Sequence, residues 1–415
     1  MELFIPEEIQ KISSTLHNAG YECYLVGGAI RNQLLGKEAK DYDLTTNAEP
    51  NIVTKLFKKV IPTGIKHGTV TILMGNSSFE ITTYRIDGKY SDGRRPDKIE
   101  FTPSIEEDLI RRDFTINSIA YNIQNKEILD INNGIEDLKN RVIRAIGDPR
   151  KRFDEDALRL VRACRFASQL NFNIDNLTYN AMSSTLEKLP DVSKERISEE
   201  LMKILKSDNP SIAFHHFFNC KMLILILPEI GQITLKNPEL LTKAIKDMDL
   251  MKTDKPYIKF SRLLQITPDN LHYSIMKDLK LSNDFIQKTM HIIKFLNTDI
   301  SLLNTDYSIR KFISLVGMNY IDDLFIAWDG MEIYKKDSLD FIKKRITHEI
   351  ELKHPFNIKD LNITGNDLIK NLNITPGPQI GKILEILLES VLESPQNNNK
   401  QQLLINAKQI NSNYL

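Results

Sequence analysis

The hydrophobic pattern of the chain changes its period near Asp148, and this change constrains the fold more than any other feature. Before that point, short β-type runs are mixed with helical stretches, and the runs include residues 24–26, 70–74 and 79–84. The last two flank a Gly-Asn turn and are predicted to pair as neighbouring strands. After it, apolar residues recur with helical spacing over 157–170, 195–205, 238–252, 282–296 and 308–316. The pattern predicts a mixed α/β head followed by an all-helical remainder.

Length and charge narrow the classes of protein. The chain has 415 residues, more than one compact domain needs, and its apolar share of 41% is enough for real cores. Lys plus Arg and Asp plus Glu both number 55, so the formal net charge is zero. A nucleic-acid partner would therefore need a local basic surface.

The cysteines and the apolar runs bear on the compartment. Cys23, Cys164 and Cys220 are scattered without a CxxC pair, so they are predicted to be ordinary core or surface residues. The acidic N-terminal segment lacks the apolar region of a secretion signal, and no apolar run approaches membrane length. We expect a cytoplasmic protein with no membrane contact.

Two adjacent glycines stand where a predicted strand gives way to a helix. Gly27 and Gly28 follow the run 24–26, and Arg31 comes one turn later. Glycines let backbone N–H groups approach a phosphate, and a helix N-terminus carries partial positive charge. Arg31 is placed to reach the same anion. Two glycines alone are a weak signal, and a turn used only for packing is the alternative.

Two carboxylates that begin ten residues after Arg31 strengthen the indication of a phosphate-binding site. In a strand, residues i and i+2 point the same way, so Asp41 and Asp43 are expected to face one side together. Carboxylates this close repel each other unless a cation lies between them. Mg²⁺ prefers such oxygen ligands, shared with substrate phosphates. A solvated acidic turn is the alternative, but the preceding glycine motif favours a metal site.

Two charged segments follow the paired carboxylates. Residues 85–103 are predicted to form a mobile loop, and they include Arg85, Lys89, Arg94 and Arg95. Further on, Arg112 precedes Asp113 and Asn117. The guanidinium fork of arginine suits triphosphate oxygens, and Asp113 or Asn117 is a candidate ligand for a ribose hydroxyl. A structural Arg–Asp pair is the alternative.

A regular series of charged residues marks the predicted helix 157–170 and its start. The series recurs every three residues and consists of Asp156, Arg159, Arg162 and Arg165. Each step turns a helix by about 60°, so Asp156 and Arg159 are predicted to form one acceptor-plus-donor pair. Such a pair would accept cytosine and adenine and reject uracil and guanine, because a wrong base leaves buried polar groups unpaired. A surface salt bridge is the alternative.

The spacing of these motifs resembles that of a known family over residues 24–228. The motifs are GGxxR, DxD, RRDFTxN, DPxxRFxEDxLRxxRAxRFA and ERIxxELxKIL. In this order they resemble bacterial class II tRNA nucleotidyltransferases and their poly(A) polymerase relatives. The resemblance implies an α+β fold with a polymerase β-like head at 1–147. It further implies an all-helical neck at 148–207, a body at 208–300 and a tRNA-binding tail at 301–415.

The same resemblance implies chemistry residue by residue. It implies Mg²⁺ as the cofactor, CTP and ATP as substrates, and tRNA as the acceptor. It also implies that no nucleic-acid template is used. Asp41 and Asp43 resemble the metal carboxylates, with Glu80 as a candidate helper. The remaining positions resemble nucleotide contacts: phosphate contacts at Gly28, Arg31 and Arg112, the ribose-sensing position at Asp113, the base template at Asp156 and Arg159, and further contacts at Arg162 and Arg165. Asn32 stands where the family usually has Asp.

Several activities within and beyond this family stay open. Full CCA addition is preferred, because the segment 85–103 is not shortened and residues 64–69 resemble the CCA-adding type. A poly(A) polymerase and a partial adder of only CC or A are the alternatives. A different class is an inactive RNA-binding homologue, against which the intact Asp41 and Asp43 argue.

Overall fold

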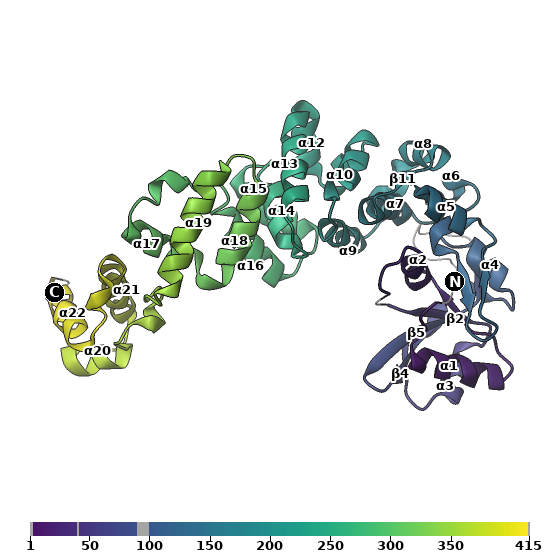
Figure 1. The fold of residues 1–415 in the computed structure, drawn as a ribbon, viewed down its shortest axis with the longest axis horizontal. Helices are drawn as coiled ribbons and strands as arrows, with labels where there is room; N and C mark the ends of the chain where they lie inside the picture. Colours follow the sequence, from purple (N-terminus) through teal and green to yellow (C-terminus); the bar gives the residue numbers. More distant parts are fainter. Residues whose placement is uncertain (1–2, 40, 89–98, 414–415) are drawn as a thin grey trace. The chain divides into compact units, whose positions relative to one another are not determined.

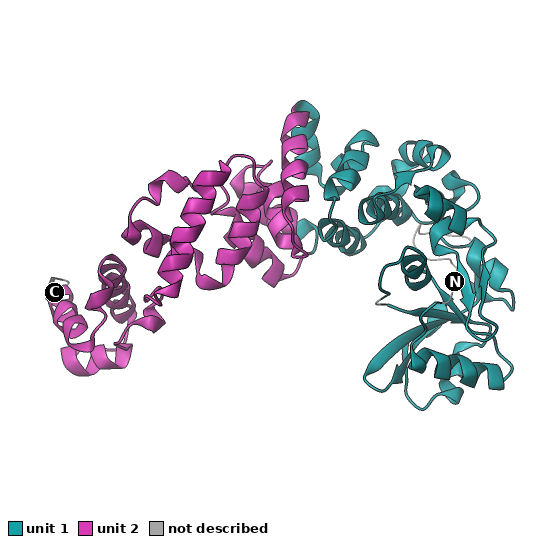
Figure 2. Cartoon of the chain, viewed as in Figure 1, with its two compact units in different colours: residues 1–236, 277–280 teal, residues 237–276, 281–415 magenta. Residues whose placement is uncertain are grey.

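The computed structural model describes residues 3–39, 41–88 and 99–413. The chain forms two compact units, residues 1–236 with 277–280 and residues 237–276 with 281–415 (Figure 2). The finer division into head, neck, body and tail stays a prediction. No helix of the described residues is both long and apolar enough to cross a membrane.

The first unit begins with a mixed seven-stranded sheet in the order β3-β4-β5-β2-β1-β8-β9. Its strands are β1 (Tyr24–Val26), β2 (Asp43–Thr46), β3 (Val60–Gly64), β4 (Thr69–Met74), β5 (Ser77–Thr83), β8 (Ala120–Asn122) and β9 (Glu127–Leu129). The predicted pairing of β4 with β5 is confirmed, with Met74 opposite Ser77. Strand β2 pairs parallel to β5, with Leu44 opposite Ile81, so Asp43 and Glu80 come to the same level of the sheet.

Helices surround and follow this sheet (Figure 1). The earlier ones are α1 (Glu7–Asn18), α2 (Gly28–Leu34), α3 (Pro50–Leu56), α4 (Ile105–Ile110) and α5 (Gly134–Asn140). The later ones are α6 (Pro149–Glu155), α7 (Leu158–Leu170), α8 (Asn176–Ser184), α9 (Lys194–Leu205), α10 (Pro210–Asn219), α11 (Leu223–Ile226) and α12 (Pro228–Lys236). Helix α7 packs against α9 and α10, which places it at the centre of this helical layer.

The segment 85–103 differs from the prediction at both ends. Strand β6 (Arg85–Asp87) pairs antiparallel with β7 (Ile99–Phe101), so the ends form a two-stranded ladder where a loop was predicted. The alternation of Ile86 and Phe101 with charged residues is too short to stand out as a strand pattern. The central residues of the segment, with Lys89, Arg94 and Arg95, lie outside the described residues.

All three thiols are in the interior of the first unit. Cys23, Cys164 and Cys220 are free and buried, which agrees with the prediction of ordinary core residues. Burial raises the pKa of the Cys23 thiol to about 12, against a smaller opposing effect of a hydrogen bond with Ser13. Burial likewise raises the pKa of Cys164 well above its usual value. A thiol in this state is a poor nucleophile, because the reactive form is the thiolate.

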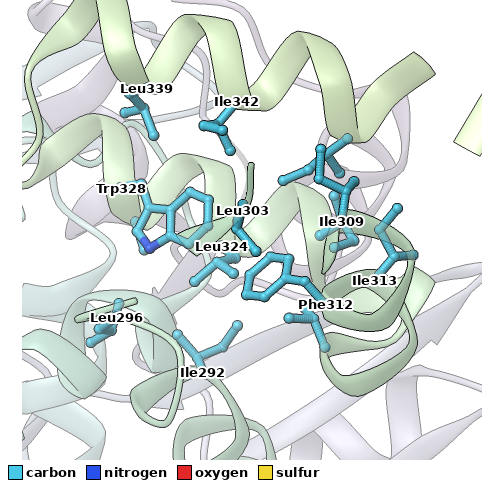
Figure 3. Close-up of a cluster of buried hydrophobic side chains, with 14 of the residues drawn as sticks. Ile292, Leu296, Leu303, Ile309, Phe312, Ile313, Leu324, Trp328, Leu339 and Ile342 are labelled. Atoms are coloured by element: carbon cyan, nitrogen blue, oxygen red, sulfur yellow. The ribbon is translucent and has the colours of Figure 1, made fainter. Parts of the chain in front are cut away.

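The second unit contains helices and no strand among its described residues. Its helices are α13 (Pro238–Leu250), α14 (Pro256–Leu264), α15 (Asp269–Asp278, of which the last two residues belong to the first unit), α16 (Asn283–Ile293), α17 (Asp306–Val316), α18 (Met318–Gly330), α19 (Lys336–Glu351), α20 (Gly365–Leu372), α21 (Pro378–Glu393) and α22 (Lys400–Asn413). Trp328 lies fully buried in its main core among Ile309, Phe312 and Leu339 (Figure 3). Its indole stacks on Phe312 with ring centroids 5.7 Å apart, and its Nε1 donates to the carbonyl of Phe295 at 3.1 Å.

Replacing Trp328 with Ala is expected to destabilise the second unit by about 3–5 kcal/mol, because it opens a large cavity and leaves the Phe295 carbonyl without this donor. Urea unfolding followed by circular dichroism measures the loss. The control is Leu302→Ala, at a side chain that is 67% exposed, for which a change within about 0.5 kcal/mol is expected. Equal losses in the two variants would contradict this account of the core.

Candidate active site

One cavity of about 660 Å³ in the first unit gathers every site residue predicted from the sequence. Its lining includes Gly28, Arg31, Asp41, Asp43, Arg112, Asp113, Asn117, Asp156, Arg159, Arg162 and Arg165. Glu80 lines it as well. We call it the main cavity. The structure thus brings these residues together, while the role of each one stays a prediction.

The turn between β1 and α2 forms one wall of the main cavity. Gly27 has a φ of +72°, a left-handed conformation that favours glycine. A Cβ at this position would also come within 3.3 Å of the Asp43 Oδ2 atom. Glycine therefore permits both the turn and the close approach of the backbone to the carboxylate.

The two predicted metal carboxylates meet in the main cavity, but not by strand alternation. Asp43 is the first residue of β2, whereas Asp41 precedes the strand, so the expectation that both lie on one strand was wrong. Although Asp43 keeps exposed surface, the cavity walls withdraw its carboxyl from water and raise its pKa. Glu80 raises that pKa further, and Arg112 opposes the rise. A bound cation would relieve this repulsion.

The donor set of these carboxylates fits a divalent ion held jointly with substrate. Among the described residues, no group of three or more His, Cys, Asp or Glu side chains is arranged to hold a metal ion. Hard cations such as Mg²⁺ commonly take one or two carboxylates and complete their shell with phosphate oxygens and water. Asp41 and Asp43 match that pattern.

Arg112 lines the main cavity, and an ion pair holds its guanidinium group. Its Nη2 lies 3.0 Å from Asp108, which also pairs with Arg111 at 2.6 Å. Burial by itself would raise the pKa of Asp108, but the two arginines hold it below its usual value. The Arg112 Nε is buried without a hydrogen-bond partner in the described part of the chain. A buried donor without an acceptor is costly.

Asp113 is held by donors on both carboxylate oxygens. Its Oδ1 accepts from the Phe114 N–H at 2.8 Å and from Asn117 Nδ2 at 3.0 Å. Its Oδ2 accepts from Arg162 Nε at 2.9 Å and Nη2 at 2.6 Å. Burial would raise its pKa, yet the charge of Arg162 and these hydrogen bonds hold it well below the usual range. A carboxylate accepts about four hydrogen bonds, so these four contacts use all the acceptor positions of Asp113. The carboxylate thereby orients Asn117 and Arg162.

The predicted mutual pair of Asp156 and Arg159 is corrected by the structure. Asp156 does not belong to α7: with φ −149° and ψ 103° it ends α6, and there its Oδ1 accepts from the Leu158 N–H. Its carboxylate pairs with both terminal nitrogens of Arg196 on α9, at 3.1 and 2.7 Å. The helical spacing argument fails because the chain leaves helical geometry at Asp156.

Arg159 is held from a different side. Its Nη1 donates to Glu155 at 2.5 Å and to the Arg152 carbonyl at 2.9 Å. Its Nη2 donates to the carbonyl of Arg111 at 3.4 Å. Asp156 and Arg159 both line the main cavity, so a base there can meet one acceptor and one donor that are fixed by separate partners.

The sequence reasoning missed several side chains around the main cavity, and three of them bear on its charge and shape. Arg196 and Phe166 line it, and buried Glu200 binds Arg165. The Phe166 ring lies beneath three guanidinium groups, with Arg165, Arg31 and Arg162 at 3.8, 5.1 and 5.4 Å from its centroid. Two charged residues four positions apart on one face of the helix 195–205 were the available signal for Arg196 and Glu200.

Three protein families match successive parts of the chain. Residues 23–144 match the Poly A polymerase head domain. Residues 171–233 match the family described as a probable RNA and SrmB-binding site of polymerase A. Residues 249–407 match the family described as tRNA nucleotidyltransferase domain 2, putative.

Relatives that match over nearly the whole chain, and similar solved structures, are CCA-adding enzymes. The CCA-adding enzyme of Lactobacillus helveticus is 37% identical over 92% of this chain and 93% of its own length. The CCA-adding enzyme of Enterococcus faecalis is 34% identical over 97% of each. In structure, the chain is similar to the Bacillus stearothermophilus CCA-adding enzyme in complex with CTP, with a TM-score of 0.84, 24% identity and 99% of each chain covered. The Thermotoga maritima CCA-adding enzyme complexed with tRNA has a TM-score of 0.63 at 21% identity, over 97% of this chain and 95% of that one.

Proposed function

Because the chain belongs to the family of CCA-adding enzymes, which are tRNA nucleotidyltransferases, we propose that it adds CMP and AMP from CTP and ATP to the 3′ end of tRNA. The observation that carries this proposal is the main cavity. There, paired carboxylates lie beside a wall of arginines, and a fixed acceptor and donor lie in the same space. This arrangement fits a metal-bound triphosphate together with a cytosine or adenine base, and it needs no template strand. We propose that this reaction takes place in the cytoplasm.

Nucleotidyl transfer in this family implies a divalent metal ion, and we propose Mg²⁺ held by Asp41 and Asp43. When bound, such an ion offsets charge on the phosphates and lowers the pKa of the attacking 3′-hydroxyl. Arg31 and Arg112, which both line the main cavity, bind phosphate oxygens in this scheme. The protein then contributes mainly by holding both reactants in line.

Base selection is assigned to Asp156 and Arg159. The Asp156 carboxylate accepts from the exocyclic amino group of C or A, and Arg159 donates to the adjacent ring nitrogen. Uracil and guanine present the opposite pattern and leave both groups unpaired. We propose that Asn117, which Asp113 orients, contacts the sugar, and that Arg162 and Arg165 complete the wall; all four residues line the main cavity. We assign nucleotide transfer to residues 1–147, base recognition to 148–207 and tRNA binding to the tail at 301–415.

The decisive assay is incorporation of labelled CTP and ATP into tRNA that ends at its discriminator base. Addition of CCA, and of nothing beyond it, is the expected result. Arrest after CC or restriction to a single A would identify a partial adder. A long adenosine tract would identify a poly(A) polymerase. No incorporation with binding intact would identify an inactive RNA-binding homologue.

Binding of tRNA is expected to be steeply salt-dependent even though the chain has no net charge. Local lysines and arginines displace counterions from the RNA, so log affinity falls against log salt by roughly 0.7 to 0.9 per phosphate contact. Filter binding or fluorescence anisotropy over a range of KCl measures the slope, with a neutral osmolyte as the control. A flat titration would mean that the RNA is not held through its backbone.

A further inference from the structure

Arg31 differs from six other arginines that line the main cavity in what holds it. Its side chain is buried, with a relative exposure of 9%. Its Nε and Nη2 donate to Asn32 Oδ1 at 3.3 and 3.1 Å, and its Nη1 donates to Asn117 Oδ1 at 2.6 Å. Both acceptors are amide oxygens and carry no charge.

Those six arginines are each paired with a carboxylate. The pairs in the described residues are Arg111 and Arg112 with Asp108, Arg159 with Glu155, Arg162 with Asp113, Arg165 with Glu200, and Arg196 with Asp156. Their charges are therefore largely balanced within the protein. The hydrogen bonds of Arg31 orient its guanidinium group but do not neutralise its positive charge, because their acceptors are uncharged.

A buried cation without an anionic partner is unfavourable unless a ligand supplies the anion. Burial lowers the pKa of Arg31 to about 10. The positive charges of Arg165 and Arg162 lower this pKa further, and the negative charge of Asp113 opposes the fall. The group is still protonated near neutral pH. Its position in the lining of the main cavity makes an incoming phosphate the available counter-charge.

We propose that Asn32 is a positioning residue that sets the affinity of the main cavity for polyphosphate, by orienting Arg31 through a neutral oxygen and so reserving its charge for the ligand. The identification of that ligand as CTP or ATP rests on the function proposed above. The anion preference itself rests only on the contacts of Arg31. An acidic side chain at position 32 would satisfy the same hydrogen bonds but neutralise the guanidinium before the ligand arrives.

The test compares Asn32→Asp with Asn32→Ala in the full chain. Asp has nearly the shape of Asn and adds the charge, whereas Ala removes the acceptor and adds no charge. Calorimetric titration with inorganic tripolyphosphate, without tRNA, is expected to give a Kd roughly tenfold higher for Asn32→Asp, as expected for one charge-assisted contact. The Ala variant is expected to fall between wild type and Asp.

Steady-state kinetics supply a readout that general damage to the fold would not reproduce. For Asn32→Asp, KM for CTP and ATP is expected to rise by a larger factor than kcat falls, with an unchanged melting temperature. Tripolyphosphate binding by Asn32→Asp that equals or exceeds wild type would overturn the inference. If wild type adds no nucleotide yet the three Kd values keep the expected order, the proposed function fails and this inference stands.

Discussion

Replacing Asp43 with Asn is expected to lower nucleotide addition by about a thousandfold or more, and Asp41→Asn to do the same. Each change removes one of the two carboxylates proposed to hold the metal ion with the triphosphate, and electrostatic stabilisation of this kind dominates phosphoryl transfer. Folding should survive, because Asp43 faces the main cavity near the Glu80 carboxylate and losing its charge relieves repulsion there. The measurement is single-turnover addition of CTP to trimmed tRNA at saturating Mg²⁺.

The matched control is Glu49→Gln, at an exposed position that precedes α3 and makes no capping hydrogen bond through its side chain. It removes one negative charge from the same unit and should keep wild-type rates. Binding of tRNA by both Asp variants should stay near wild type. Substantial turnover by Asp43→Asn would remove the basis of the metal assignment.

Replacing Arg159 with Ile is expected to reduce discrimination against UTP and GTP by roughly tenfold to a hundredfold. The lost contact to the base is charge-assisted, and such contacts contribute about 1.5–3 kcal/mol. A simple surface salt bridge is worth about 0–1 kcal/mol and would not alter selectivity. The relevant numbers are kcat/KM ratios for the four nucleotides on tRNA acceptors.

Arg144→Ile provides the comparison for this variant. Arg144 pairs with Asp137 and Asp175 outside the main cavity, at 3.1 and 2.6 Å. Its loss is expected to change stability while leaving the nucleotide ratios intact. Wild-type ratios in Arg159→Ile would show that the base is read by other residues and that this part of α7 is scaffold.

Much of the fold follows from hydrophobic periodicity and turn chemistry. The β4–β5 hairpin is predictable because two alternating runs flank a Gly-Asn turn. The helices α7 and α9 are predictable because each carries more than ten residues of continuous helical spacing. Strands β6 and β7 are not, since three residues each are too few to establish a period.

The site residues could be identified from motif spacing, but their partners could not. Spacing along a helix predicts contacts only while the backbone stays helical, and at Asp156 it does not. The pairing of Asp156 with Arg196 joins residues forty positions apart, and the choice of Asn117 as acceptor for Arg31 joins residues eighty-six apart. Such pairings depend on how helices and sheet pack together, which local sequence does not encode.

The distribution of two rare residue types gives each unit its own reporter of unfolding. All three cysteines are buried in the first unit, and the only tryptophan, Trp328, is buried in the second. Alkylation of thiols therefore records when the first unit opens, while indole fluorescence records when the second unit loses its core. The wild-type protein, without added probes or mutations, can thus show whether substrate protects one unit from denaturant, both units, or neither.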